Sequence, residues 1–266
     1  MNRQLLITAL TLAVTSILCA CSAMPPEVRS DLAPRGTLRV AINLGNPILA
    51  NRDAASGQPV GVSVDLAREL ARRIGTPLET VTYTSAGQVV EAVKANQVDI
   101  AFVAIDPVRG ADMHYTAPYV VIEGAYLVRV TSPLQRNEEV DRSGVRVTVG
   151  AGSAYDLYLR RELKQATLVR APTSPAVVDL FLAQNLDVAA GVKQQLEADA
   201  RRVPGLRLLP GRFMVINQAM ATPRGRGEAG IRYLRDFIEE MKSSGFVAQA
   251  LERHGIQGAA VAPPGP

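Results

Sequence analysis

The stretch from 98 to 119 constrains the fold most, because in it a buried strand runs directly into a charged loop. Its first part, VDIAFVAI, is apolar or β-branched apart from Asp99 and contains no turn residue. Such a run is typical of a strand that is buried on both faces of a parallel sheet. A turn at Asp106 then ends the run, and Arg109 follows. Because ligands bind at the carboxyl ends of strands in open α/β sheets, this loop is a candidate binding site. The alternative is a solvated turn with an ordinary surface arginine.

The residues before this loop predict alternating strands and helices. We expect strands at 38–42, 78–83 and from 98, and helices at 63–74 and 86–96. In the first helix, Leu66, Leu70 and Ile74 recur with helical spacing, and Gly75 is a stop signal. A β-α-β-α-β order implies a parallel sheet with right-handed crossovers.

The same scheme restarts after a strand at 120–128 and a polar boundary at 132–144. Strands are expected at 145–149, 167–169 and 186–190, and helices at 154–163 and 174–184. Val98-Asp99-Ile100-Ala101 resembles Leu186-Asp187-Val188-Ala189 at an offset of 88 (187 − 99), and the preceding helices share that offset. The repeat predicts two similar α/β lobes; the alternative is two unrelated helix–strand units with common residue types.

A returning strand at 213–221 and helices at 230–241 and 246–254 complete the pattern. The simplest topology places 36–127 plus 217–257 in lobe 1 and 128–216 in lobe 2. Two strands then cross between the lobes as a hinge, and a cleft lies between them. Such clefts are preferred small-molecule sites, and hinge closure around a ligand is the expected motion.

The amino terminus reads as a targeting segment. Residues 1–20 contain Arg3 and an apolar stretch at 5–18, which is too short for a typical membrane span. The segment ends in Leu18-Cys19-Ala20-Cys21 and resembles a bacterial lipoprotein signal, which implies lipidation of Cys21 and a membrane-anchored periplasmic location; a plain secretory signal is the alternative. The proline-containing 21–35 is expected to be a tether, and the small residues and prolines of 258–266 a disordered tail.

Composition excludes several kinds of site. Both cysteines lie at 19 and 21, so the folded part has no cysteine nucleophile and no cysteine metal site. The two histidines, His114 and His254, are far apart, and we predict neither a metal nor a cofactor. A net charge of +4 without basic runs interleaved with aromatic residues, and without Trp, indicates no nucleic-acid partner.

Four motifs identify a family resemblance. They are Gly61-Val62-Ser63-Val64-Asp65-Leu66-Ala67, Ile105-Asp106-Pro107-Val108-Arg109 with Tyr115-Thr116-Ala117-Pro118-Tyr119, Gly152-Ser153, and Asn217-Gln218-Ala219. In order and spacing, 36–254 resembles the bacterial extracellular solute-binding protein family 3, the periplasmic receptors of polar amino-acid ABC importers. The resemblance implies a type II periplasmic binding fold: two α/β lobes joined by a two-strand hinge. It also implies a monomeric, non-enzymatic protein that delivers a small carboxylate-containing solute to an ABC transporter permease.

The resemblance also assigns the carboxylate half of a ligand site. Arg109 matches the arginine that binds the ligand's α-carboxylate, and a guanidinium does form bidentate, charge-assisted bonds with carboxylates. Ser153 matches the second-lobe residue whose backbone N–H and hydroxyl contact the same group at a helix N-terminus. Asp106 stands where a Thr or Ser orients the ligand, and Tyr119 ends the second motif.

The other half of an amino-acid site departs from the family pattern. Gly191 stands where relatives carry an Asp for the α-ammonium group. Asn43 and Asn46 lie in the segment that often supplies a stacking aromatic side chain. Asp106 or Glu123 could replace the missing charge; alternatively, Glu123 pairs with a structural arginine.

Two other functions stay open on this fold. Periplasmic dehydratases of cyclohexadienyl substrates share it and need a general acid, for which Asp106 and Glu123 are the candidates. A ligand-sensing lipoprotein without a transport role is the third possibility.

Overall fold

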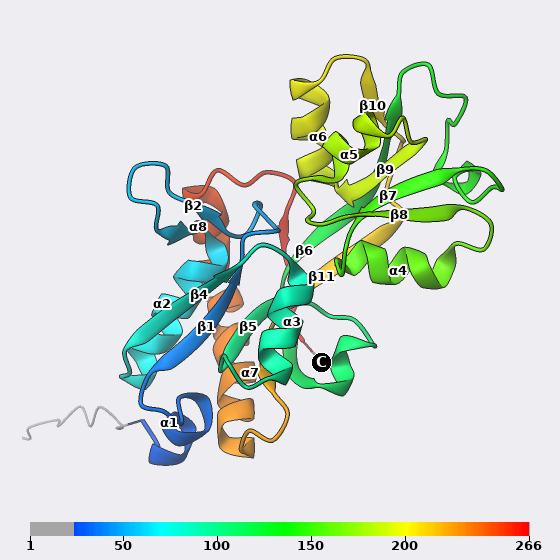
Figure 1. The fold of residues 1–266 in the computed structure, drawn as a ribbon. Helices are drawn as coiled ribbons and strands as arrows, with labels where there is room; N and C mark the ends of the chain where they lie inside the picture. Colours follow the sequence, from blue (N-terminus) through cyan, green and yellow to red (C-terminus); the bar gives the residue numbers. More distant parts are fainter. Residues whose placement is uncertain (1–23, 266) are drawn as a thin grey trace, which may run out of the picture.

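The computed structural model describes residues 24–265, which form two α/β lobes (Figure 1). The predicted signal peptide at 1–20 and the predicted lipidation site Cys21 lie outside these residues. The strands are β1 (Leu38–Asn43), β2 (Asn51–Arg52), β3 (Pro59–Val60), β4 (Leu78–Tyr83), β5 (Ile100–Ala104), β6 (Met113–Arg129), β7 (Arg146–Gly150), β8 (Thr167–Ala171), β9 (Val188–Val192), β10 (Leu206–Leu208), β11 (Met214–Pro223) and β12 (Ala260–Val261).

Helices cover the sheet in both lobes (Figure 1). The α-helices are α1 (Pro26–Leu32), α2 (Val62–Ile74), α3 (Ala86–Lys94), α4 (Ala154–Glu162), α5 (Val177–Ala183), α6 (Lys193–Arg202), α7 (Glu228–Ser243) and α8 (Phe246–Arg253). Short 3-10 turns, η1 (Arg109–Ala111) and η2 (Asn137–Glu139), follow β5 and precede β7.

The main sheet has ten strands within the described chain. Its order is β4-β1-β5-β11-β6-β9-β7-β8, with β10 and β12 also paired to β6. β1 runs parallel to β4 and β5, and β7 runs parallel to β8 and β9. The predicted parallel arrangement is therefore confirmed on both sides of the sheet. β5 is buried along its whole length, as its unbroken apolar run predicts.

Two long antiparallel strands stand at the centre of this order. β6 has 17 residues and pairs with β11 from Met113 to Gly124. Toward one lobe β11 also pairs with β5, and toward the other β6 pairs with β9. These are the crossing strands that the sequence predicts as a hinge. The lobe limits at 127/128 and 216/217 stay a prediction.

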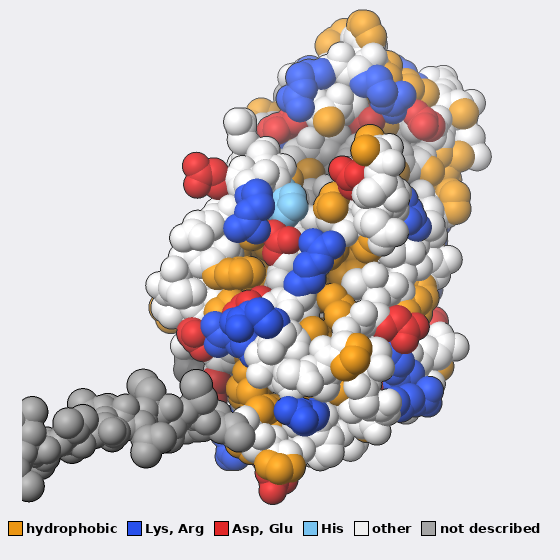
Figure 2. Space-filling model, turned by 90° about the vertical axis from the view of Figure 1, so that its left-hand side faces the viewer, with side chains coloured by type: hydrophobic (Ala, Val, Ile, Leu, Met, Phe, Trp, Pro, Cys, Tyr) orange, Lys and Arg blue, Asp and Glu red, His pale blue; other side chains and the backbone are white. Residues whose placement is uncertain are grey.

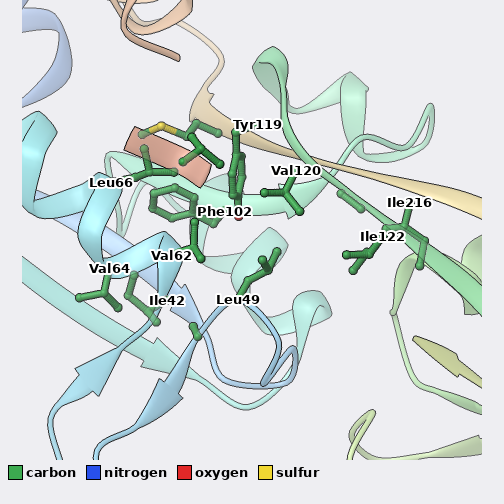
Figure 3. Close-up of a cluster of buried hydrophobic side chains, with 14 of the residues drawn as sticks. Ile42, Leu49, Val62, Val64, Leu66, Phe102, Tyr119, Val120, Ile122 and Ile216 are labelled. Atoms are coloured by element: carbon green, nitrogen blue, oxygen red, sulfur yellow. The ribbon is translucent and has the colours of Figure 1, made fainter. Parts of the chain in front are cut away.

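The core of the first lobe forms where α2 packs beside the sheet. Leu66, Leu70 and Ile74 are fully buried, which matches their helical spacing. Gly75 adopts a left-handed conformation with φ of 65° and ends the helix. Figure 3 shows Leu66 close to Phe102 and Tyr119, whose rings meet edge to face at 5.8 Å.

The predicted tether at 21–35 is wrong for 26–32, which form α1. Val28 and Leu32 are buried and belong to the same core as α7 residues such as Leu234. The Asp31 carboxylate accepts a hydrogen bond from the Gly230 N–H at 2.9 Å. Proline is well suited to a helix's first position, and residues four apart share one face, so this proline-containing segment forms a docked helix.

The predicted disordered tail at 258–266 is also wrong for its described residues. β12 pairs with β6 at Val120 and Val121, and Ala262 is 4% exposed. Beyond it, the Lys242 ammonium donates to the Pro263 carbonyl oxygen at 2.8 Å. Backbone hydrogen bonds to a free strand edge need no hydrophobic pattern, so small residues gave no signal for this strand.

The helix–strand repeat seen in the sequence is also present in the structure, but the two copies differ by one residue in the connection between helix and strand. Asn96 and Asn185 both adopt positive φ after their helices and are 89 positions apart (185 − 96). Asp99 and Asp187, before the next strands, are 88 apart (187 − 99). The connection between helix and strand is therefore one residue shorter in the second lobe.

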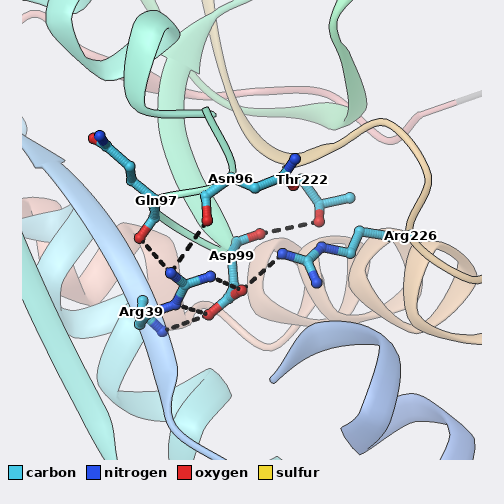
Figure 4. A network of polar contacts seen from close by, with 6 residues as sticks. All are labelled: Arg39, Asn96, Gln97, Asp99, Thr222 and Arg226. Atoms are coloured by element: carbon cyan, nitrogen blue, oxygen red, sulfur yellow. Dashed lines mark hydrogen bonds and ion pairs between the residues drawn. The ribbon is translucent and has the colours of Figure 1, made fainter. Parts of the chain in front are cut away.

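Each repeated aspartate pairs with an arginine on the adjacent parallel strand, Asp99 with Arg39 of β1 and Asp187 with Arg146 of β7. Asp99 is fully buried and binds Arg39 at 2.7 Å and Arg226 at 2.8 Å (Figure 4). Asp187 binds Arg146 at 2.9 Å but keeps 39% of its side chain exposed. In both pairs the carboxylate also accepts the arginine's own backbone N–H, so each pair ties two adjacent strands together.

We predict that Asp99→Asn lowers the free energy of unfolding by about 3–5 kcal/mol, because it leaves two buried guanidinium groups without a counter-charge. The matched variant Asp187→Asn should cost about 1 kcal/mol or less, since its pair is solvated. Urea unfolding of both variants measures the difference. Equal losses would contradict the burial argument.

Candidate functional site

A small cavity lies between the lobes, at the carboxyl ends of β1 and β5 and the amino end of α4. Its volume is about 30 Å³, which holds about two water molecules. The lining residues are Asn43, Gly45, Asn46, Ala86, Ala104, Arg109, Ser153, Ala154, Tyr155, Ser174, Val192, Ile216 and Gln218. The lobes are thus closed against each other over the predicted site.

Arg109 places a positive charge at this cavity. It begins η1 immediately after the loop that follows β5 and is 3% exposed. Its guanidinium donates to the Ala104 carbonyl oxygen at 3.2 Å and to the Gly152 carbonyl oxygen of the other lobe at 2.6 Å. Burial lowers the pKa of Arg109 from its ordinary value, against the influence of Tyr115 and Asp106. Arginine stays charged in proteins, so the cavity carries a buried cation bonded to neutral carbonyls.

Asp106 joins the two lobes instead of lining the cavity. It is 4% exposed, and one carboxylate oxygen accepts the Val108 N–H at 2.9 Å. The other oxygen lies 3.0 Å from the guanidinium of Arg161, on α4 of the second lobe. Asp106 therefore serves as one half of an ion pair that spans the closed cleft.

Ser153 lines the cavity at the beginning of α4. Its hydroxyl oxygen accepts the Asp156 N–H at 3.0 Å, as a helix N-cap does. Its own N–H donates to the Gly150 carbonyl oxygen at 3.1 Å, so the turn already uses this group. The hydroxyl hydrogen is what the side chain can still donate to a ligand.

The turn before Ser153 brings the lobes into close approach. Gly152 has a φ of +68°, and a Cβ placed on it would lie 3.1 Å from the Cα of Gly87 on α3. Asp156 accepts the Gly152 N–H and forms an ion pair with Arg170, which holds the turn. A side chain at Gly152 would push the lobes apart.

Asn43 and Asn46 both line the cavity, and their contact with a ligand stays a prediction. The Asn43 side-chain oxygen accepts the Gly45 N–H at 2.9 Å, which shapes the turn after β1. The Asn46 side-chain oxygen is buried without a hydrogen-bond partner among the described residues. Asn46 also lines a smaller adjoining cavity of about 10 Å³.

The structure places the other three predicted site residues outside the main cavity. Tyr119 is fully buried in the first lobe, with its hydroxyl 3.2 Å from the Ser63 hydroxyl, and burial raises its pKa (Figure 3). Glu123 pairs with Arg212 at 2.6 Å and Lys193 at 3.0 Å, as the structural alternative in the sequence analysis describes. These placements do not support a ligand contact for Tyr119 or Glu123.

Gly191 lines the smaller adjoining cavity. A Cβ placed on it would lie 3.2 Å from the Leu196 side chain of α6, so a larger residue requires that side chain to shift. The same cavity is lined by Asp199, also from α6. The Asp199 carboxylate accepts hydrogen bonds from Arg202 at 2.9 Å and from Gln195 at 3.2 Å.

Sequence reasoning missed Tyr155, Ser174, Gln218 and Asp199. Tyr155 lies in the first turn of α4, two positions after Ser153, and that spacing is a signal that could have revealed it. Gln218 lies in one of the motifs, but its orientation depends on the pairing of β11 with β5. Asp199 belongs to α6, whose sequence, KQQLEADARR, has few apolar positions to predict a packed helix.

Other kinds of site lack support within residues 24–265. No group of three or more His, Cys, Asp or Glu side chains is placed to hold a metal ion. None of the helices in that range is long and apolar enough to span a bilayer. On the face shown in Figure 2, Lys and Arg side chains are spread among acidic and apolar ones.

The family follows from a profile match. The profile of bacterial extracellular solute-binding proteins, family 3, matches residues 38–257. The chain belongs to this family. Among solved structures, it resembles a protein from Wolinella succinogenes described as a binding component of an ABC transporter and complexed with lysine. That likeness has a TM-score of 0.71 at 23% identity, over 82% of this chain and 95% of that one.

A second similar structure is an amino acid ABC transporter substrate-binding protein from Streptococcus pneumoniae bound to L-arginine. Its TM-score is 0.72 at 19% identity, over 84% of this chain and 96% of that one. At these identities the likeness concerns the fold, and the predicted type II periplasmic binding fold is confirmed.

A curated relative is longer than this chain. It is the membrane-bound lytic murein transglycosylase F of Idiomarina loihiensis, 24% identical over 259 residues. The match covers 92% of this chain and 55% of that protein, so the chain spans about half the relative's length. The matched half corresponds to almost the whole of the present chain.

We predict a pH-dependent contribution from Glu123. Hydrogen bonds from Arg212 and Lys193 lower the pKa of its carboxyl below the ordinary value of 4.5. A depressed folded-state pKa stabilises the fold above the unfolded pKa, and this stabilisation disappears as pH falls through the folded pKa. Glu123→Gln should therefore lower the free energy of unfolding by about 1 kcal/mol at pH 7 and progressively less below pH 4.5.

Urea unfolding between pH 7 and pH 3 measures this effect, with Glu138→Gln, at an exposed position, as the control. A deficit in Glu123→Gln that stays constant with pH would exclude the ion pairs as its cause.

We also predict that Arg161→Gln opens the ligand-free lobes. The variant removes the ion pair with Asp106. Because the Arg161 side chain is 38% exposed, the pair contributes about 1 kcal/mol at most, and the ratio of closed to open molecules should fall by about fivefold at most. Small-angle scattering should show a larger radius of gyration than for Arg160→Gln, a substitution at the exposed neighbouring position. An identical radius for both variants would show that this pair does not hold the cleft closed.

Proposed function

We propose that the protein is the periplasmic solute-binding component of an ABC importer and closes its lobes over a small carboxylate. The observation that carries this proposal is Arg109, a buried cation at the cavity with carbonyl partners from both lobes. Family membership supports solute binding as the general role.

The chemistry of the cleft supports a carboxylate ligand. A guanidinium that donates to a carboxylate forms shorter and stronger hydrogen bonds than one that donates to neutral carbonyls. The Gly152 carbonyl oxygen accepts a hydrogen bond from one of the Arg109 donors. A ligand carboxylate at this position would replace it and could accept the Ser153 hydroxyl as well. One anion would then bond to both lobes, so binding would favour closure.

The location and partners belong to the same proposal. A lipidated Cys21 would anchor the chain at a membrane facing the periplasm, where an importer's permease receives the solute. The two crossing strands support a hinge motion that the permease could distinguish as open or closed.

The dehydratase alternative receives no support from the placement of acidic groups. A general acid must reach the substrate and benefits from a raised pKa. Among the described residues, no carboxyl side chain lines the main cavity. Asp106 is paired with Arg161, and the pKa of Glu123 is lowered by Arg212 and Lys193.

The test of this proposal is Arg109→Gln beside Arg109→Lys. Removing one partner of a buried, hydrogen-bonded charge pair costs about 2 kcal/mol or more, or about a 30-fold weaker Kd. We expect Gln to abolish ligand-induced thermal stabilisation by a carboxylate, and Lys to restore part of it, because an ammonium keeps the charge but loses the bidentate geometry.

Thermal shift and calorimetry over a panel of amino acids, dicarboxylates and hydroxy acids measure the outcome, and Arg160→Gln is the control for a lost surface charge. Undiminished stabilisation of Arg109→Gln by a carboxylate would refute the assigned role.

A further inference from the structure

The segment 258–265 lies along the hinge strand β6, where that strand passes between the lobes (Figure 1). Its strand β12 pairs with Val120 and Val121, and β11 pairs with the same two residues on the opposite edge of β6. The Ala262 N–H continues this pairing by donating to the Tyr119 carbonyl oxygen at 3.1 Å. β12 therefore adds a third strand beside the two crossing strands.

Side chains of α7 fix the far end of this segment to the first lobe. The Lys242 ammonium donates to the Pro263 carbonyl oxygen at 2.8 Å, and the Gly265 N–H donates to the Glu239 carboxylate at 3.2 Å. α7 packs against α1 and α8 of the same lobe. The segment is therefore carried by the first lobe, and its other end has a defined place relative to the second.

That other end meets the second lobe. Because β11 occupies one edge of β6, β9 pairs with the edge that β12 also uses; it does so from Gly124 onward and ends at Val192, where α6 begins. There Gly258 packs against Gln194, in the first turn of α6. A Cβ placed on Gly258 would lie 3.0 Å from the side-chain nitrogen of Gln194 and 3.5 Å from its Cγ. The side-chain oxygen of Gln194 is buried without a hydrogen-bond partner in the described part of the chain, so the contact is closed to water.

The distance between Gly258 and Gln194 depends on the angle between the lobes. One residue is carried by the first lobe and the other by the second, and only 122–123 of β6 separate the residues paired with β12 from those paired with β9. A bend of β6 at these residues moves the two groups relative to each other. In the closed structure they are packed together, and glycine, at a φ of +73°, has no Cβ to hold them apart.

We propose that the segment 258–265 is a strap that stabilises the closed form, through the contact of Gly258 with α6. The contact exists in the closed form and separates when the lobes move apart, so its free energy favours closure. None of the residues 258–265 lines the main cavity, so the strap acts on the ratio of closed to open molecules and not on the ligand contacts. A ligand that binds one form is bound more weakly when that form is rarer, so the strap adjusts affinity from outside the site.

A matched pair of glycine substitutions tests the contact. Gly258→Leu places a side chain against Gln194, whose displacement is restricted because its oxygen is buried. Gly255→Leu is the control, since Gly255 also has a positive φ, +65°, but nothing lies within 4 Å of its Cβ position. Both variants carry similar backbone strain, and only Gly258→Leu creates an overlap between the lobes. In that variant alone the ratio of closed to open molecules should fall by about fivefold or more, because overpacking is costly.

Small-angle scattering of the ligand-free full chain measures this ratio. The expected result is a larger radius of gyration for Gly258→Leu than for Gly255→Leu. Equal radii for the two variants would show that the contact does not influence closure and would overturn the proposal.

Removal of 258–266 tests the strap as a whole. We expect the truncated chain, shown to be folded by a cooperative thermal transition, to shift toward the open form as Gly258→Leu does, because the second lobe then has no segment to pack against at the start of α6. A truncated chain that folds and stays closed would overturn the strap. For a truncated chain that fails to fold, the glycine pair alone decides.

Discussion

The closed arrangement of this protein depends on one buried guanidinium. Arg109 is 3% exposed and bonds to a carbonyl in each lobe, so its charge is withdrawn from water without a carboxylate in direct contact. A cation in such a place is costly unless an anion approaches it. This unbalanced charge is the reason for the proposal that the ligand is an anion. Asp106 and Arg161 add a second bridge at the edge of the cleft, where partial exposure keeps the interaction weak and reversible.

The remainder of the fold holds these groups in register. β6 and β11 pair with each other along the centre of the sheet and are the strands common to both lobes. Away from that hinge, each lobe has its own arginine–aspartate pair between adjacent strands. The pair of Arg39 with Asp99 is buried, whereas that of Arg146 with Asp187 is partly solvated. The lobe that carries Arg109 is thus held together by the more buried of the two repeated contacts.

Particular residues show how far the sequence predicts the site. Arg109, Ser153, Asn43 and Asn46 line the cavity because each follows a strand or begins a helix, and those positions are readable from local patterns. Tyr119 and Glu123 lie on β6, where alternate residues point to opposite faces and strand pairing decides what each face meets. Their placement in the core and in a surface ion pair is consequently a tertiary outcome. Asp199 was missed because α6 has almost no apolar periodicity, although its carboxylate lies beside the cleft.

The sequence by itself determined the order of strands and helices, the repeat of the two lobes and the charged loop after β5. These features depend on short-range periodicity and turn chemistry, which a linear pattern encodes. The tertiary structure alone decided that α1 and β12 dock onto the first lobe and that Asp106 pairs across the cleft. Each of these depends on contacts between segments that are far apart in the sequence. Burial and hydrogen-bond satisfaction are set by those contacts and not by neighbouring residues in the chain.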